Sequence, residues 1–172
     1  MTLDLGVCVL RPWRRGDEAS LAQHADNRAV SRNLKDTFPH PYAPADAEEW
    51  IRRNVDAERL TNFAITVDAA AVGGIGIIPG TDVDRRSAEI GYWLAEPYWG
   101  RGIATTALQA VTEWAFATFD LVRLQADVYE WNPASARVLE KAGYTLEGRQ
   151  RKGVTKDGVT MDRLVYVIVR EE

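Results

Sequence analysis

The clearest chemical signal in the sequence is a glycine-rich stretch, Trp99-Gly100-Arg101-Gly102-Ile103-Ala104-Thr105, which directly precedes a segment with helical periodicity. Gly100 and Gly102 permit tight or positive-φ geometry and Ala104 is small, so successive backbone N–H groups can converge on an anion. The unpaired N–H groups and the positive dipole end of the helix add to that attraction, and Arg101 can supply a cation. We therefore predict a pyrophosphate-binding loop; the alternative is a tight turn that only begins a helix.

Other phosphate and metal motifs are excluded by spacing. The glycines in Gly73-Gly74-Ile75-Gly76 are followed by Ile77-Ile78-Pro79-Gly80 rather than by a helix, and the third glycine of the dinucleotide fingerprint is missing at the required offset. The chain has no Gly-Lys-Ser/Thr step and hence no P-loop. His24 and His40 show neither triad nor metal spacing, and the single Cys8 lies in an apolar run, as expected for a core residue. We predict no metal site.

A second group of polar residues begins another predicted helix. Asn132 precedes Pro133, and Asn at the N-cap with Pro at the first helical position is a favoured helix start, with Ser135 in the first turn. Capping and ligand contact can coexist in the same side chains. Lys141, further along the helix, could assist with a phosphate, although an exposed helical lysine usually has no specific role.

The elements that must position these residues combine both periodicities. Strands are expected at residues 7–12, 63–67, 71–78, 87–94, 121–128, 144–151 and 161–170, and helices at residues 17–27, from 44 onward, 103–119 and 133–142. Residues 68–70 and Asp157-Gly158 are expected to connect hairpins, and 121–128 is expected to be a buried strand. This order indicates an α+β fold whose sheet contains parallel and antiparallel pairs.

Length and charge restrict the class of protein. A chain of 172 residues with 46% hydrophobic and 27% charged residues suits one folded domain, residues 1–172. The net charge of −4 and the dispersed basic residues give no footprint for nucleic acid, so phosphates must be held by local groups. Neither a secretory signal nor a membrane-spanning run is visible, so we expect a cytoplasmic protein without a membrane partner.

Taken together, these motifs resemble those of the Gcn5-related N-acetyltransferase (GNAT) family, in its ribosomal-protein N-terminal acetyltransferase (RimJ/RimL-like) branch. The resemblance covers nearly the whole chain. The matching segments are Leu10-Arg11-Pro12-Trp13 with Asp17, Ala88-Glu89-Ile90-Gly91-Tyr92-Trp93-Leu94, the loop from Trp99 to Ala104, and Asn132-Pro133-Ala134-Ser135-Ala136-Arg137-Val138-Leu139-Glu140-Lys141-Ala142-Gly143-Tyr144. Trp99 stands where the broader family pattern often begins with Gln or Arg.

The resemblance implies a fold, a cofactor and residue roles. It implies a mixed sheet of about seven strands with about four helices, splayed between the fourth and fifth strands, and acetyl-coenzyme A bound at the loop without a metal. The backbones of Trp93, Leu94 and Ala95 would pair with the pantetheine arm, as buried N–H and C=O groups need partners. Asn132 would contact the arm, and Ser135 would lie near the sulfur.

A base is also needed, because an amine with a pKa near 10 must lose a proton before it attacks a thioester. Glu89 is our candidate: a carboxylate among apolar neighbours in a central strand would have a raised pKa. The alternative is a strand glutamate paired with Arg85 or Arg86. The backbone N–H of Leu94 could hold the developing oxyanion.

The predicted reaction is direct attack by a primary amine on the thioester in a ternary complex. The acceptor could be a protein N-terminus or a small-molecule amine, and the donor could be another acyl-coenzyme A such as succinyl-coenzyme A. The alternatives from other classes are a non-catalytic coenzyme A-binding module and a module that binds a protein terminus. The sequence leaves open whether the chain forms a homodimer. Residues 161–170 could form the contact edge if that strand is uncovered.

Overall fold

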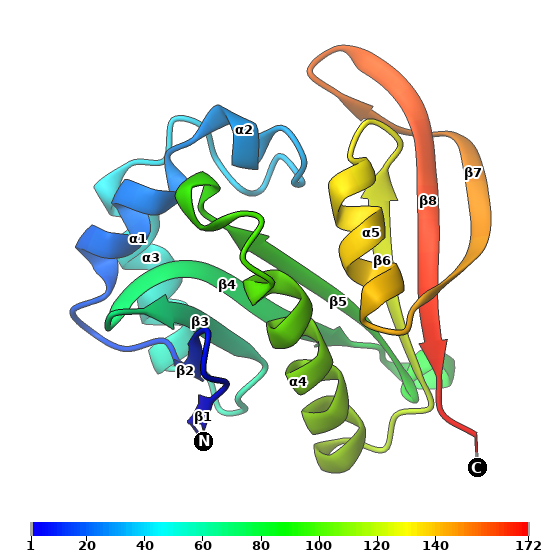
Figure 1. The fold of residues 1–172 in the computed structure, drawn as a ribbon, viewed down its shortest axis with the longest axis horizontal. Coiled ribbons are helices and arrows are strands. Elements are labelled where there is room, and N and C mark those ends of the chain that lie inside the picture. The colour runs from blue at the N-terminus through cyan, green and yellow to red at the C-terminus, as the bar shows by residue number, and fades with distance from the viewer. Residues whose placement is uncertain (1, 172) are drawn as a thin grey trace. The chain divides into compact units, whose positions relative to one another are not determined.

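The computed structural model describes residues 2–171, which form one open mixed sheet of eight strands and five α-helices. The strand order is β1-β2-β3-β4-β5-β6-β8-β7 (Figure 1). Strands β5 and β6 pair in parallel. The pairs β1–β2, β2–β3 and β3–β4 are antiparallel, and β8 is antiparallel to both β6 and β7. The mixed class is as predicted, with one more strand and one more helix than expected.

The bounds of the elements follow the sequence pattern closely in most places. The α-helices are α1 (Glu18–Ala25), α2 (Arg28–Ser31), α3 (Pro44–Val55), α4 (Ile103–Thr118) and α5 (Pro133–Lys141). The strands are β1 (Leu3–Asp4), β2 (Val9–Pro12), β3 (Asn62–Val67), β4 (Ala70–Pro79), β5 (Ser87–Leu94), β6 (Arg123–Tyr129), β7 (Thr145–Lys156) and β8 (Val159–Val169). Short 3₁₀ helices lie at Asp82–Asp84 and Glu96–Tyr98.

The additional elements are short ones that periodicity cannot detect. Strand β1 has two residues and α2 has four, each less than the window in which an apolar repeat becomes visible. The predicted helix at 17–27 ends early because Asn27 caps α2 instead, its side chain accepting a 2.7 Å hydrogen bond from the Ala29 N–H.

The C-terminal hairpin differs from its prediction in two ways. Strand β7 extends to Lys156, and only Asp157 and Gly158, both at positive φ, separate it from β8. Strand β8 lies between β6 and β7, so residues 161–170 do not meet the condition, an uncovered strand, under which they could serve as a contact edge. The edge strand is β7, which carries register irregularities between Leu146 and Gly148 and between Gln150 and Val154. Such bulges are typical of a protected sheet edge.

By its internal contacts the described chain divides into two compact units. The first contains the residues up to Gly76 together with Tyr92–Ala107, and the second contains Ile77–Gly91 together with the chain from Leu108 onward. The core of the first unit brings α1 and α3 against β3 and β4. Its buried side chains are Trp13, Leu21, Ala25, Tyr42, Ala47, Ile51, Ala64 and Ala71.

In the second unit α5 packs by its buried Leu139 and is joined to β8, whose Tyr166 hydroxyl donates to the Glu140 carboxylate over 3.0 Å. Burial, with the Glu140 carboxylate nearby, raises the pKa of Tyr166. A buried 2.8 Å hydrogen bond joins the hydroxyls of Thr112 and Tyr144 and fixes α4 to the segment after α5. Within residues 2–171, no helix is both long and apolar enough to cross a membrane.

Candidate functional site

The predicted phosphate loop follows directly from β5 in the first unit. After Leu94 the chain makes the 3₁₀ turn Glu96–Tyr98, in which the Tyr98 N–H donates to the Ala95 carbonyl over 3.0 Å. The indole Nε1–H of Trp99 returns to the Leu94 carbonyl with a 2.7 Å hydrogen bond. The end of β5 is thereby fixed to the start of the loop.

The two loop glycines have the backbone geometry that the sequence predicts. Gly100 has φ +74° and Gly102 has φ +76°, a region that favours glycine. A Cβ added to either residue would meet no protein atom within 4 Å other than those of its chain neighbours, so packing against the rest of the protein does not require glycine there. The open space in front of both glycines is available to a ligand.

Helix α4 begins at this loop, with the Thr106 N–H donating to the Gly102 carbonyl over 3.0 Å. The preceding N–H groups, those of Ile103, Ala104 and Thr105, belong to a first turn whose donors have no partner within the helix. An open glycine backbone followed by such donors suits a pyrophosphate. The residues present therefore fit the phosphate part of coenzyme A.

The other glycine cluster has a different role. A Cβ on Gly73 would lie 2.5 Å from the Trp93 carbonyl oxygen, and one on Gly74 would lie 2.8 Å from the Trp93 Nε1. These glycines allow β4 to approach the end of β5, and the Ala95 N–H donates to the Val72 carbonyl over 2.8 Å in the same region. They position Trp93 and are not a ligand loop.

The second unit carries Asn132 and Ser135 at the start of α5. The Asn132 side chain accepts a 3.3 Å hydrogen bond from the Ser135 N–H, so the predicted N-cap is confirmed. Both side chains are half-buried. Their contact with a cofactor arm stays a prediction.

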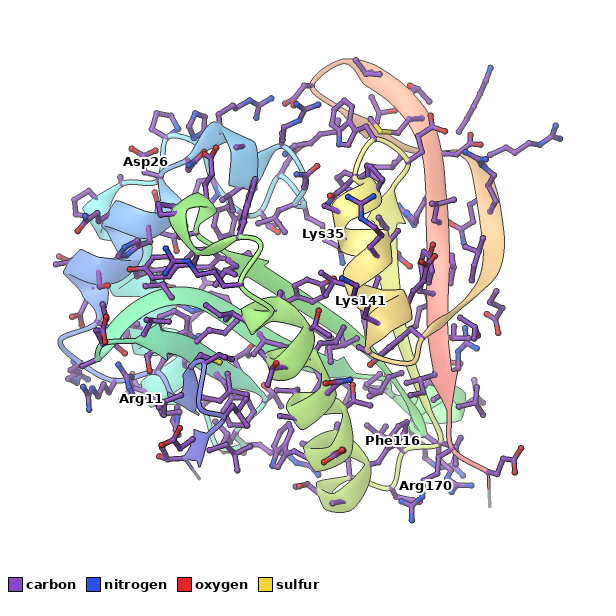
Figure 2. All side chains as sticks on the ribbon, in the orientation of Figure 1. Arg11, Asp26, Lys35, Phe116, Lys141 and Arg170 are labelled. Atoms are coloured by element: carbon purple, nitrogen blue, oxygen red, sulfur yellow. The ribbon has the colours of Figure 1, made fainter. Side chains whose placement is uncertain are left out.

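Lys141 lies at the opposite end of α5, where it is exposed (Figure 2). Its carbonyl accepts a 3.3 Å hydrogen bond from Gln109 of α4. Lys141 follows Ser135 by six positions along α5, about 9 Å along the axis. One ligand could reach both only if it were elongated.

Glu89 lies on β5, half-buried, between the buried Ala88 and Ile90. It is the last residue of the parallel ladder, opposite Gln125 of β6. Of the two arginines considered as its partners, Arg86 forms an ion pair of 3.2 Å with Asp120, and Arg85 donates to the Asp82 carbonyl over 3.1 Å.

A row of polar side chains on β6 was not foreseen. Arg123 donates to Gln125 over 3.0 Å and Gln125 donates to Asp127 over 3.1 Å, while two bonds of 2.7 and 2.6 Å join Arg123 to Glu147 of β7. The Arg123 guanidinium lowers the pKa of Glu147. Buried and half-buried positions alternate along β6, so the strand predicted at 121–128 is present and carries these polar side chains on its half-buried face; its polar alternation was the available signal.

The predicted site residues are thus distributed over both units. The first carries Trp93, Leu94, Trp99, Gly100, Arg101, Gly102, Ile103, Ala104 and Thr105, and the second carries Glu89, Asn132, Ser135 and Lys141. Glu89 and Trp93 belong to one strand, β5, which supplies residues to both units.

Comparisons with known proteins identify the family to which the chain is similar. A family model described as "Acetyltransferase (GNAT) domain" matches residues 8–145. The SPbeta prophage-derived uncharacterized N-acetyltransferase YokL of Bacillus subtilis (strain 168) is 30% identical over 83% of this chain and 80% of its own. Spermidine N(1)-acetyltransferase of Escherichia coli (strain K12) is 26% identical over 81% of this chain and 73% of its own.

Solved structures have the same fold. RimJ of Mycobacterium smegmatis, in complex with a coenzyme A disulfide, superposes with a TM-score of 0.84. It is 30% identical, and the match covers 96% of this chain and 83% of that one.

Proposed function

Because the chain belongs to the GNAT acetyltransferase family, we propose that it transfers an acetyl group from acetyl-coenzyme A to a primary amine. As a member of that family it is an acyltransferase. The observation that carries the cofactor assignment is the loop at Gly100 and Gly102, where positive φ and open space in front of the backbone precede a helix N-terminus.

The cofactor contacts are proposed residue by residue, from the resemblance to the family. The backbone N–H groups from Gly102 to Thr105, with the Arg101 guanidinium, would hold the pyrophosphate. The backbones of Trp93 and Leu94 would pair with the pantetheine arm, with Asn132 contacting it from α5. Trp99 contributes by fixing the Leu94 carbonyl, and Lys141 would meet a phosphate at the far end of α5.

The bound cofactor supplies an activated thioester. Glu89 would accept a proton from the amine, directly or through water, so that the amine can attack the carbonyl. The Leu94 N–H would donate to the developing oxyanion, and the Ser135 hydroxyl would hydrogen-bond the departing thiolate. The new amide bond forms as the carbon–sulfur bond breaks.

Direct transfer is favoured over a cysteine intermediate. Cys8 is buried, and burial together with the nearby Asp4 raises the pKa of its thiol. A buried thiol with a raised pKa is a poor nucleophile.

The acceptor is a primary amine of one of two kinds, a protein N-terminus or a small-molecule amine. The resemblance to the RimJ/RimL-like branch supports the first kind, and the similarity to a protein named spermidine N(1)-acetyltransferase supports the second. A homodimer and a cytoplasmic location stay predictions of the sequence.

The test is release of the coenzyme A thiol from acetyl-coenzyme A with an acceptor panel. The panel pairs free α-amino peptides with the same peptides already N-acetylated, and adds spermidine. Release that requires the free amine and falls in Glu89→Gln is the expected result. Binding of acetyl-coenzyme A without release of the thiol in the presence of any amine would favour the non-catalytic module. Faster thiol release from succinyl-coenzyme A than from acetyl-coenzyme A would identify the succinyl compound as the preferred donor.

A further inference from the structure

Tyr98 lies directly before the phosphate loop, and its ring contacts a residue inside that loop. The Arg101 guanidinium carbon lies over the Tyr98 ring, 5.2 Å from its centroid. A cation over an aromatic face is attracted by the ring quadrupole. Arg101 is exposed, so in the absence of this contact its long side chain would have many rotamers.

The Tyr98 ring is itself supported by α1. The His24 imidazole meets it edge-on, with ring centroids 5.9 Å apart. His24 is fixed in turn, since its Nδ1 lies 2.9 Å from the Ser20 carbonyl and the Ser20 hydroxyl donates to the Ala71 carbonyl over 2.9 Å. The Tyr98 ring thus contacts both His24 of α1 and Arg101 of the loop.

A second contact fixes the same turn to α1. The Asn27 side chain donates to the Glu96 carboxylate over 2.8 Å. Two side chains of the turn, Glu96 and Tyr98, therefore connect it to the segment at His24 and Asn27. All of these residues belong to the first unit.

We propose that Tyr98 is a positioning residue, whose ring holds the Arg101 guanidinium at the phosphate loop so that Arg101 can bind the pyrophosphate of the cofactor. A guanidinium whose carbon lies over an aromatic ring can still direct its N–H groups outward in its own plane, where phosphate oxygens can accept them. This inference rests on the proposed function, because it requires that the loop bind coenzyme A.

The test is a double-mutant cycle in which the affinity for coenzyme A is measured by calorimetry. The variants are Arg101→Gln, Tyr98→Leu and both together, with Tyr98→Phe as the matched control that keeps the ring. Arg101→Gln should weaken binding roughly tenfold, as expected for a lost charge-assisted hydrogen bond. Tyr98→Leu should weaken it about two- to fivefold, the range of an exposed cation–π contact, and Tyr98→Phe should stay within about twofold of wild type.

The cycle separates positioning from a structural role. If Tyr98 acts through Arg101, Tyr98→Leu has no further effect in the Arg101→Gln background. An equal loss in both backgrounds, or no loss in either, overturns the proposal while leaving the function intact. Failure of the wild type to bind coenzyme A would contradict the proposed function itself.

A second variant keeps the test valid if Tyr98→Leu loses its fold. Arg101→Lys retains the charge but not the planar face or its fork of donors, so it should bind more weakly than wild type and more tightly than Arg101→Gln. Binding by Arg101→Lys equal to that of wild type would show that a point charge suffices, and would overturn the proposal that a positioned planar guanidinium binds the pyrophosphate. Circular dichroism and the unfolding midpoint establish that each variant is folded.

Discussion

Arg11 and Asp17 form a buried bidentate ion pair in which the two guanidinium Nη atoms each donate a 2.7 Å hydrogen bond to a different carboxylate oxygen. Figure 2 labels Arg11, which lies on β2 in the first unit. The Arg14 N–H also donates to Asp17, over 3.1 Å. The Asp17 carbonyl accepts a hydrogen bond from the Leu21 N–H, so the ion pair fixes the path of the chain from β2 into α1.

Removing one partner of this pair should be strongly destabilising. Asp17→Asn leaves the guanidinium of Arg11 buried without its counter-charge, and we expect a loss of about 3–5 kcal/mol in the free energy of unfolding, measured with urea. The control is Asp56→Asn, which breaks the exposed 3.8 Å pair with Arg15 and should change stability by less than about 1 kcal/mol. Equal losses in the two variants would contradict the structural role of Asp17.

Asn132 should show two separable roles. Asn132→Ala removes the N-cap of α5 and should cost about 1 kcal/mol of stability, whereas Asn132→Ser keeps a capping oxygen and should cost less. If the amide also contacts the cofactor, both variants should bind acetyl-coenzyme A about fivefold more weakly, the effect of one hydrogen bond. Wild-type affinity in Asn132→Ser would limit this residue to capping.

Glu89→Gln tests the proposed base. The substitution keeps the shape of the side chain and removes its capacity to accept a proton, so kcat should fall roughly 10²- to 10⁴-fold with little change in affinity for acetyl-coenzyme A. Glu113→Gln, at an exposed position of α4, is the control and should keep full activity. Activity of Glu89→Gln close to that of wild type would assign the proton to another group or to water.

Tyr42 should make the protein sensitive to alkaline pH. Burial, with the nearby Asp46 carboxylate, raises the pKa of Tyr42 to about 12. An unfolded tyrosine ionises near pH 10, so the unfolded state loses its proton first and stability should fall as the pH rises from about 10 to 12. Tyr42→Phe should flatten this fall in urea unfolding measured across the range. An unchanged slope would show that other groups cause it.

Local sequence signals predicted the elements that position the site. Ser87–Leu94 has the bounds expected for β5, and Pro44 begins α3 where the proline and the acidic first turn indicated a helix start. Asp157 and Gly158 form the turn of the last hairpin as their types suggest. These features depend on residues close together in the chain, so composition and spacing are sufficient to find them.

Contacts between distant residues could not be predicted in this way. A glycine is needed at position 73 because a Cβ there would clash with the Trp93 carbonyl, twenty residues further along the chain. The Tyr98 ring contacts His24, which lies on another element. The edge position of β7 depends on where the last strand inserts into the sheet, because β8 pairs with β6 over a long antiparallel ladder. Such pairings are set by tertiary packing, which a local pattern does not encode.

The most direct test of the cofactor site is calorimetric titration of acetyl-coenzyme A into the wild type, Gly102→Glu and the control Gly158→Glu. Gly158 has φ +75° and an equally open Cβ direction, but it lies in the β7–β8 turn, so both substitutions should cost similar stability. We expect one saturable site in the wild type and in Gly158→Glu, and an affinity reduced at least roughly 100-fold in a folded Gly102→Glu by bulk and charge. Absence of wild-type binding, or unchanged affinity in Gly102→Glu, would contradict the assignment of the cofactor to this loop.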